Sequence, residues 1–509
     1  MSNSRKLMTV GGAGGEYVED VFSTLLFRGT NQPLERVNGI DLADKGGLVW
    51  SKCRSLTFDH SLSDTERGVN KSLASNSTDV ESSALSITSF NSDGYSVGAN
   101  ANNVNDAGSD FVSWTFAKQK GFFDIITYEG NGINNREIPH NLGSVPGMII
   151  IKAMDAAASW RVWHKGYNGS GLYLNLDSVW PSDAPAFDST QSSETLNLSY
   201  NSNSVNTPGR TFVAYLFADD APMFGPNGDE SIIKCGSYTG TGVTNEIDLG
   251  WEPQFLLFKC TTRDTMWLMY DSMRGVGSDV PSTPEGGGDA GLSPSSERVE
   301  FYGTNIDINA TGFTLTSALS SLNQSGEEYI YMAIRRPHKP ASEFEPDELF
   351  AVETNIAESP SYNSGFPIDM ALTTRPTSAS QSAISARLLD GSYIKSTDSD
   401  AKIDNVKYAW DFPDGWYDSP GDGPGIFQSW MFRRAPGFFD VVTYAGDGVA
   451  GRRLPHNLGV KPDMIWVKAV SGDRDWQVAY SKKDMTYDGD LKWLMKLNKN
   501  AGWGSSNVF

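Results

Sequence analysis

Two histidines in one repeated motif are the first candidates for chemistry in this sequence. His140 and His456 each stand in Pro-His-Asn-Leu-Gly. A metal site would need a second histidine, a cysteine or a carboxylate pair at ligand spacing, and neither motif has one. No Ser-His-Asp or Cys-His set indicates nucleophilic catalysis. We therefore interpret both as turn histidines, and we expect no catalytic residue, no metal ligand, no cofactor and no enzymatic activity.

Carboxylates are numerous in this acidic chain, so a pair of them says little by itself. Asp398, Asp400 and Asp404, and further on Asp488 and Asp490, offer the hard oxygen atoms that calcium prefers, but the sequence has no EF-hand loop. Two carboxylates also hydrolyse glycosidic bonds when the fold sets them at a suitable separation. Calcium binding and glycoside hydrolysis are therefore alternatives that the sequence leaves open.

Aromatic residues recur at a fixed distance from a lysine that ends an apolar strand. Tryptophan follows the lysine by eight residues in three copies, which are Lys152 with Trp160, Lys259 with Trp267 and Lys468 with Trp476. After Lys52 the same position is His60. A flat aromatic face suits a sugar ring, but the position lies in an apolar strand in each strong copy, so we interpret it as core packing.

Two acid–base pairs share a further offset from that lysine. They are Asp64 with Arg67 and Asp271 with Arg274, and we predict that each pair stabilises a turn. Three other aromatic residues recur nowhere else in the chain, and we expect them to form a contact surface: Trp410, Trp416 and Tyr417.

The elements that carry these residues are repeated along the chain. Residues 120–152 read KGFFDIITYEGNGINNREIPHNLGSVPGMIIIK, and residues 436–468 read PGFFDVVTYAGDGVAGRRLPHNLGVKPDMIWVK. Apolar runs separated by glycine turns predict a strand, a turn, a strand, a turn and a strand. Weaker copies lie at 25–52 and 238–259, and the spacing of the marker glycines, 130 − 29 = 101 residues between the first two, gives the period.

A period of this length is the usual size of an independently folding domain. We therefore predict an all-β, elongated chain of tandem β-sandwich-like repeat domains of about 100 residues, each with its own core. The predicted ranges are a leading segment at 1–22, repeats at 23–120, 121–225 and 226–340, a degenerate repeat at 341–435 and an incomplete one at 436–509. For the last we expect that the natural chain continues or that strands come from another chain.

Composition narrows the classes of partner. The formal net charge is −21 and the pI is near 4.7, which disfavours nucleic acid and anionic membrane surfaces. Three cysteines in no metal-ligand spacing argue against a disulfide framework. The N-terminus has no apolar signal region and no long apolar run follows, so we expect folding in a cytoplasm and no membrane insertion.

The repeat phrases, together with FNSDGYSVG and VAYLF, resemble modules of tail fibre and other tail-associated virion proteins of marine tailed bacteriophages. The likeness covers the first, second, third and fifth repeats. The resemblance implies a structural or adhesive protein of the virion tail, made in the host cytoplasm. It also implies other tail proteins (adaptor, nozzle or baseplate) and a host surface receptor, possibly a glycan, as partners, and a homotrimer.

On this basis we expect a non-enzymatic tail fibre that is fixed to the tail by its N-terminal segment and supports attachment to the host. Tyr17 and Phe22 are the expected anchors to the virion. One alternative is a purely structural capsid horn, capsid decoration or tail-sleeve protein. Another is a tailspike depolymerase that cuts surface polysaccharide.

Overall fold

The structure of the chain is a computed structural model. It describes these residues: 15–83, 86–99, 101–167, 171–179, 186–199, 205–276, 288–357, 360–376, 382–389, 391–404, 410, 412–417, 426–480, 493–499 and 504–505. Units 1 to 5 below denote the ranges 23–120, 121–225, 226–340, 341–435 and 436–509.

Antiparallel strands make up almost all of the regular structure, which confirms the all-β prediction. Unit 1 contains β1 (Phe22–Arg28), β2 (Leu34–Val37), β3 (Gly47–Cys53), β4 (Ser61–Asp64), β5 (Ile87–Asn91), β6 (Gly94–Val97), the short helix α1 (Asn102–Asn105) and β7 (Asp110–Ala117). Unit 2 contains β8 (Phe123–Glu129), β9 (Arg136–Pro139), β10 (Pro146–Ala153), β11 (Arg161–His164), β12 (Leu172–Tyr173), β13 (Thr195–Leu198) and β14 (Thr211–Ala218).

The later units have the same kind of strands. Unit 3 contains β15 (Ile233–Thr239), β16 (Asn245–Asp248), β17 (Pro253–Cys260), β18 (Leu268–Asp271), β19 (Asp289–Leu292), β20 (Phe301–Gly303), β21 (Ile306–Asn309), β22 (Gly312–Leu315) and β23 (Glu328–Arg335). Unit 4 contains β24 (Phe350–Thr354), β25 (Tyr362–Asn363), β26 (Met370–Thr374), β27 (Ala383–Ala386), β28 (Ser392–Lys395), β29 (Ile403–Asp404), β30 (Gly415–Trp416) and β31 (Gln428–Phe432). Unit 5 contains β32 (Met464–Val467), β33 (Gln477–Tyr480), β34 (Trp493–Met495) and β35 (Gly504–Ser505). Single 3-10 turns lie at Val18–Asp20, Ala341–Glu343, Pro346–Glu348 and Arg387–Leu389.

Units 1 to 4 share one strand order in their larger sheet. The first strand pairs with the last strand of the unit, here called the closing strand, which pairs in turn with a central strand. The orders are β1-β7-β3-β4, β8-β14-β10-β11-β12, β15-β23-β17-β18-β19-β20 and β24-β31-β26-β27-β28-β29. Each of these four units also has a smaller sheet, such as β2-β6-β5 in unit 1. There Tyr95 of β6 donates from its hydroxyl to Ser113 of β7 at 2.7 Å, so the two sheets pack together and the unit is sandwich-like. Each described sheet takes its strands from a single unit.

The central strands read as continuous apolar runs because both of their faces are covered. All residues of β3, β10 and β17 are buried. The lysine that ends each run lies opposite an equivalent residue of the closing strand: Lys52 pairs with Val112, Lys152 with Val213 and Lys259 with Ile330. Equal registers in three units show that the sequence repeat is also a structural repeat.

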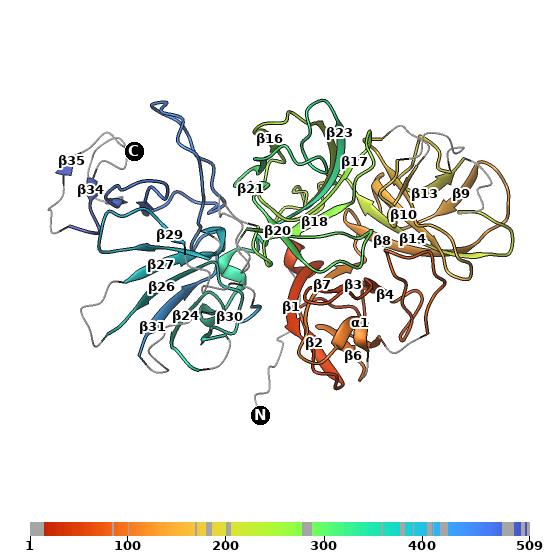
Figure 1. Cartoon of the computed structure of the whole chain (residues 1–509), viewed down its shortest axis with the longest axis horizontal. Helices are drawn as coiled ribbons and strands as arrows, with labels where there is room; N and C mark the ends of the chain where they lie inside the picture. The colour runs from red at the N-terminus through yellow and green to blue at the C-terminus, as the bar shows by residue number, and fades with distance from the viewer. Residues whose placement is uncertain are drawn as a thin grey trace.

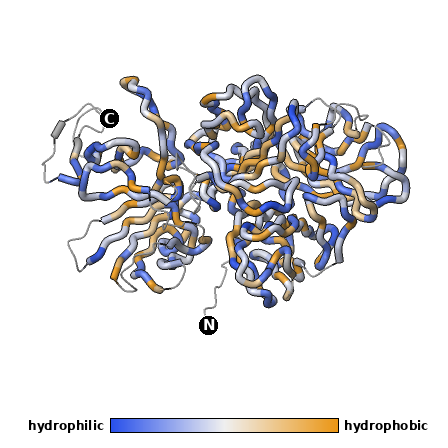
Figure 2. Tube along the Cα trace, viewed as in Figure 1, coloured by the Kyte–Doolittle hydropathy of each residue, from blue (hydrophilic) through white to orange (hydrophobic). Residues whose placement is uncertain are grey.

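The apolar core is not divided as the sequence predicts. One connected cluster of buried residues runs from Val18 to Ile334 and includes side chains from units 1, 2 and 3. The prediction of beads with separate cores is therefore wrong for these three units. The three units occupy the corners of the larger lobe and pack against one another in its middle (Figure 1). Figure 2 shows hydrophobic stretches of chain gathered where the units meet. Part of unit 3 also has a second cluster around Phe258 and Phe313.

Units 4 and 5 form the smaller lobe, which lies beside the larger one along the longest axis of the molecule (Figure 1). Unit 4 has an internal cluster around Tyr362 and Met431. A further cluster joins Ile384 and Ile394 of unit 4 to Trp476 of unit 5, so these two units also share buried surface.

Candidate functional site at the interfaces between units

A buried lysine connects each unit of the larger lobe to its neighbour. The side chains of Lys52, Lys152 and Lys259 are 0% exposed. Each Nζ donates to one or two carbonyl oxygens of its own unit and also to one carbonyl oxygen of another unit. Those partner oxygens belong to Glu297 at 3.2 Å from Lys52, to Thr78 at 3.2 Å from Lys152 and to Asp177 at 2.7 Å from Lys259. A buried ammonium needs such partners, since an unsatisfied one is strongly unfavourable. Burial lowers the pKa of each lysine to about 8.

The aromatic position that follows each lysine makes a second contact between the same units. Trp160 Nε1 donates to Ala74 O at 2.9 Å, and Trp267 Nε1 donates to Tyr173 O at 2.8 Å. In both pairs the acceptor lies four residues before the carbonyl that accepts from the lysine. The predicted core packing of these tryptophans is confirmed, because they are 0% and 1% exposed. Their N–H groups also hold the interface.

His60 takes the place of tryptophan in unit 1 and makes the same contact. Trp50 Nε1 can only donate, so Nδ1 of His60 accepts from it at 3.0 Å and the ring proton lies on Nε2. Nε2 then donates to Ser293 O of unit 3 at 2.9 Å. Burial, together with the nearby charge of Lys52, lowers the pKa of His60 to about 3, so the ring is neutral at pH 7.

The three interfaces close a ring. Unit 2 donates to unit 1 through Lys152, unit 3 donates to unit 2 through Lys259, and unit 1 donates to unit 3 through Lys52. A chain of separate beads would have no contact between unit 1 and unit 3. The ring explains why one apolar core spans all three units.

Side chains at the start of each turn reinforce the ring. The predicted pairs are confirmed, with Arg67 Nε 2.5 Å from Asp64 Oδ2 and Arg274 Nε 2.6 Å from the equivalent atom of Asp271. Each carboxylate also binds an aromatic residue of another unit. Tyr215 donates to Asp64 at 2.8 Å, and Trp114 Nε1 donates to Asp271 at 3.0 Å.

His164 is the equivalent of these two aspartates in unit 2. Its Nδ1 accepts from the N–H of Gly166 at 3.0 Å, so Nε2 carries the proton and donates to Tyr331 O of unit 3 at 3.0 Å. Burial lowers the pKa of His164 to about 4. The closing strand of unit 3 has the apolar Met332 where the others have Trp114 and Tyr215, which is why the contact there uses a backbone carbonyl.

The residues expected to anchor the chain to a virion close the ring instead. Phe22 is 2% exposed, and its ring packs edge-on against Phe116 of unit 1 at 5.0 Å and against Phe255 of unit 3 at 5.8 Å between ring centroids. Tyr17 is 5% exposed and packs on His338 at 5.3 Å. Both side chains are buried by contacts within the chain, so neither is exposed to a partner in this structure.

Residues 15–22 act as a clasp for the ring. The N–H of Gly225 at the end of unit 2 donates to Glu16 O at 2.8 Å, and Lys339 at the end of unit 3 donates from Nζ to Asp20 at 2.8 Å. In unit 1 the N–H of Ala117 donates to Val21 O at 2.8 Å. The clasp therefore touches all three units, and residues 1–14, the rest of the expected attachment segment, lie outside the described residues.

The interface between units 4 and 5 follows the same pattern as those in the ring. Lys468 Nζ donates to Ser399 O at 3.2 Å and to Asp400 O at 2.6 Å, and Trp476 Nε1 donates to Lys395 O at 2.9 Å. Ser399 again lies four residues after the acceptor of the tryptophan. Units 4 and 5 are therefore joined as units 1 and 2 are.

A backbone hydrogen bond completes the pattern at three of these interfaces. In the neighbouring unit, the donor is the N–H of the residue three positions after the carbonyl that accepts from the lysine (Glu297, Thr78 or Ser399). The acceptor is the carbonyl oxygen of the residue two positions after the lysine itself. The pairs are Glu81 N to Met154 O at 2.8 Å, Glu300 N to Arg54 O at 2.9 Å and Lys402 N to Val470 O at 3.0 Å.

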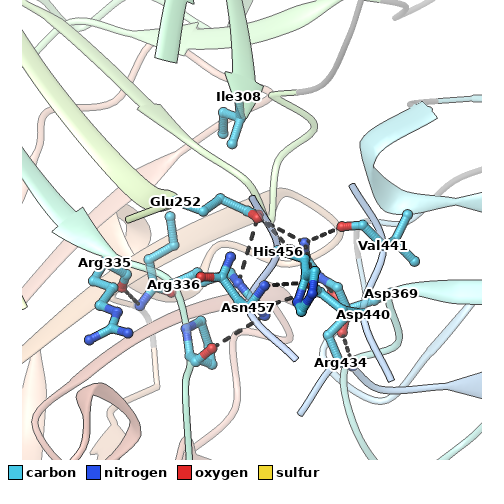
Figure 3. Close-up of polar contacts among 12 residues, drawn as sticks. Glu252, Ile308, Arg335, Arg336, Asp369, Arg434, Asp440, Val441, His456 and Asn457 are labelled. Atoms are coloured by element: carbon cyan, nitrogen blue, oxygen red, sulfur yellow. Dashed lines mark hydrogen bonds and ion pairs between the residues drawn. The ribbon is translucent and has the colours of Figure 1, made fainter. Parts of the chain in front are cut away.

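A buried cluster of charged residues fixes the smaller lobe to the larger one (Figure 3). Arg434 of unit 4 binds Glu252 of unit 3 through two hydrogen bonds of 2.6 and 3.0 Å, and Asp369 lies 3.4 Å from its Nε. Arg336 of unit 3 binds Asp440 of unit 5 at 3.1 Å. Burial disfavours the charge on Arg434, but Glu252 and Asp369 outweigh it and raise its pKa above the ordinary value.

The expected contact surface in unit 4 is not a surface in this structure. Trp410 is 2% exposed and Trp416 is 0% exposed, and their rings stack at 5.3 Å inside the core of unit 4. Trp416 Nε1 also donates to Ser429 at 3.1 Å. The prediction for these two tryptophans is wrong, because a residue type that occurs in one unit only can still fill that unit's core. Tyr417 is half-buried.

The turn interpretation of His140 and His456 is confirmed. In both motifs the histidine Nδ1 accepts from the backbone N–H two residues later at 3.2 Å. His140 Nε2 also lies 3.2 Å from Ser192 O, and burial lowers the pKa of His140 below its usual range.

The structure describes three of the five aspartates that were candidates for calcium binding, namely Asp398, Asp400 and Asp404. Lys395 forms ion pairs with Asp398 at 3.3 Å and with Asp400 at 3.2 Å. Asp488 and Asp490 lie outside the described residues. In the part of the chain that the structure describes, no three histidine, cysteine, aspartate or glutamate side chains gather as a metal site would require, and no helix is long and apolar enough to cross a membrane.

Sequence reasoning identified the positions of the interface residues but not their role. From the sequence, the lysine and the aromatic residue eight positions later are recognised as recurring features of the repeat, but not as residues that contact a neighbouring unit. The available signal was that a charged residue recurs at the end of an apolar strand, since a lysine in that context must find buried acceptors.

The fold and its interfaces define an all-β protein in which three repeated units close into a ring and two further units follow. The chain belongs to the family DUF7483, described as a domain of unknown function, whose model matches residues 18–337. This match begins in the clasp and ends at the last residues of unit 3, so the family domain is the ring with its clasp. No curated protein and no solved structure matches the chain.

Proposed function

We propose that this chain is a structural protein of a tailed bacteriophage virion, namely a tail fibre or tail-associated protein that supports attachment to the host. The observation that carries the proposal is the recurrent buried interface, which joins the repeated β units into multi-unit lobes. The likeness of the repeat phrases to tail fibre modules supplies the biological setting.

Residues 1–14 are the proposed attachment to the tail. They lead directly into the clasp, and the clasp is hydrogen-bonded to units 1, 2 and 3. A force on this end would therefore be shared by the whole ring instead of being carried by a single unit. The partners at this end would be an adaptor, nozzle or baseplate protein, and a homotrimer would multiply weak contacts with the host surface.

Deletion of residues 1–14 tests the attachment without disturbing the clasp. We expect particles to assemble with tails that lack this protein, as detected by immunogold labelling. A second variant has the same residues replaced by a Gly-Ser sequence of equal length, which keeps the length of the segment but removes its side chains. Normal incorporation of both variants would contradict attachment through this segment.

A purely structural role on the capsid or along the tail is the second candidate. The burial of Trp410 and Trp416 favours it, because it removes the residues that were expected to contact the host. Cryo-EM of the particle separates the two. Density that leaves the tail and ends freely in solvent supports a fibre, and density that lies flat on virion proteins along its whole length supports the structural role.

A further inference from the structure

The two lobes meet at a joint that has no apolar core among the described residues. Each apolar cluster belongs to one lobe, since two lie within the ring and its clasp and two lie within units 4 and 5. Besides the charge cluster, Arg387 Nη1 donates to Met273 O and Thr443 Oγ1 donates to Ile308 O across the joint, both over 3.4 Å. Polar interfaces of this kind between domains permit relative motion.

The lysine contact that joins the other units is not used at this joint. Thr374 ends β26 and pairs with Gln428 of the closing strand, as Lys52 pairs with Val112 in unit 1. Unit 4 therefore has a threonine at the position from which the other units donate to a neighbour. Docking of the smaller lobe depends on buried ion pairs, whose attraction is largely offset by the cost of removing charges from water.

The segment that leads from the ring to the joint has a restricted backbone. Residues 336–340, here called the link segment, read Arg-Pro-His-Lys-Pro. Each proline fixes its own φ and restricts the residue before it, so four of these five residues have little backbone freedom. Arg336, at the start of the link segment, donates from its N–H to Glu252 O at 2.9 Å and from its guanidinium to Asp440 of unit 5 at 3.1 Å (Figure 3).

The other end of the link segment is held by the clasp. The N–H of Lys339 donates to Glu19 Oε1 at 2.8 Å, and its Nζ donates to Asp20 Oδ1 at 2.8 Å. The ring of His338 is 7% exposed and packs edge-on against Tyr17. The clasp and the smaller lobe therefore hold opposite ends of the same short segment.

We propose that the clasp controls the docking of the smaller lobe on the ring through the link segment. Release of the clasp frees His338 and Lys339, lets Arg336 leave Asp440 and favours an undocked arrangement of the lobes. Because coupling between two equilibria is reciprocal, undocking in turn loosens the clasp. A protein that binds the N-terminal end of the chain and pulls on the clasp thereby moves the smaller lobe, and this coupling holds whether or not the chain belongs to a virion.

Single-molecule FRET on the full chain measures the fraction of molecules with undocked lobes. The dyes are attached through Val243→Cys, at a 66% exposed position of unit 3, and Glu353→Cys, at an exposed position of unit 4. The three natural cysteines are buried and therefore inert to the dyes. Arg434→Gln is the common background, because the loss of its pair with Glu252 raises the undocked fraction into the measurable range. Thr443→Val, which removes one hydrogen bond of the joint, is the milder background if Arg434→Gln does not fold.

Lys339→Met removes the ion pair between the link segment and the clasp. We expect the undocked fraction to rise about two- to fivefold, the range that a partly exposed ion pair supports. Lys45→Met is the matched control, because Lys45 of unit 1 pairs with Glu16 of the clasp. The two lysine side chains are almost equally exposed, at 26% for Lys45 and 24% for Lys339. The control leaves the link segment untouched and should change the undocked fraction much less.

A double variant tests the route from the clasp to the joint. If the clasp acts through Arg336, Lys339→Met should have little further effect once Arg336→Gln is present. Three results would each overturn the proposal. They are equal effects of the two lysine variants, an unchanged undocked fraction in Lys339→Met, and additive effects of Lys339→Met and Arg336→Gln.

Discussion

The ammonium group of Lys152 in unit 2 donates a hydrogen bond to the carbonyl oxygen of Thr78 in unit 1 over 3.2 Å. Equivalent bonds link Lys259 to Asp177 and Lys52 to Glu297, so the same contact occurs between each pair of units in the ring. A side chain that ends a buried strand in one unit thus satisfies a carbonyl in the next. This relationship makes the three units one structure.

Replacing Lys152 with methionine tests the energetic weight of this contact. The stem of the side chain is kept, but three carbonyl oxygens lose a donor, so we expect the free energy of unfolding to fall by about 1–3 kcal/mol. Lys165→Met is the matched control in the same unit, because Lys165 is a solvent-exposed lysine and should change stability by less than about 0.5 kcal/mol. Urea denaturation measures both, and equal effects would contradict a special role for Lys152.

Acid should weaken the ring through His164. Its pKa is about 4 in the folded chain and about 6.5 in the unfolded chain, so the unfolded chain binds the proton first as the pH falls. The contribution to stability is complete above pH 6.5 and is lost between pH 6.5 and 4, at up to about 1.4 kcal/mol for each pH unit.

The variant His164→Gln keeps a donor and an acceptor but does not titrate. We expect its stability to depend less steeply on pH between 6.5 and 4 than that of the natural protein, as measured by urea denaturation at several pH values. His456→Gln changes an exposed histidine and is the control. An unchanged slope in His164→Gln would show that this group does not couple the ring to pH.

The charge cluster should hold the two lobes together. Arg434→Gln leaves the carboxylate of Glu252 buried without its two-bond partner, and we expect destabilisation by about 3–5 kcal/mol. Glu252→Gln in the same chain should restore part of the loss, because the carboxylate that Arg434→Gln leaves without its two-bond partner is then replaced by a neutral amide. Arg452→Gln removes an exposed ion pair and should cost less than about 1 kcal/mol. If the double variant were as unstable as the sum of the single ones, the pair would not be coupled.

Replacing Phe22 distinguishes a role in the core from a role as an anchor to the virion. Because its ring contacts aromatic side chains of units 1 and 3, we expect Phe22→Ala to lower the stability of the isolated protein by about 3–5 kcal/mol. Thermal unfolding monitored by circular dichroism measures the change. A residue that served only to bind a tail protein would leave the unfolding temperature unchanged.

Much of the fold could be predicted from the sequence because strand patterning is local. Alternating apolar runs, glycine turns and the spacing from Gly29 to Gly130 indicated repeated β units, and the aspartate–arginine pairs indicated their turns. These signals depend on residues close in the sequence. The same is true of the turn histidines.

The ring could not be predicted because its contacts join distant residues. Lys52 and Glu297 lie far apart in sequence, and the acceptor is a backbone carbonyl that no residue type marks. Burial was misjudged for a related reason. Trp410 and Trp416 were unusual in sequence, which says nothing about whether a side chain faces solvent or the core.

Native-state hydrogen exchange of the full chain tests most directly whether units 1 to 3 form one cooperative structure. The amides of β3, β10 and β17 would be followed as urea is raised below the unfolding transition. The ring predicts that the slowest amides of the three strands exchange with a common free energy and a common dependence on urea. Three separate free energies, each with the urea dependence of a single unit, would contradict the ring and restore a chain of independent beads.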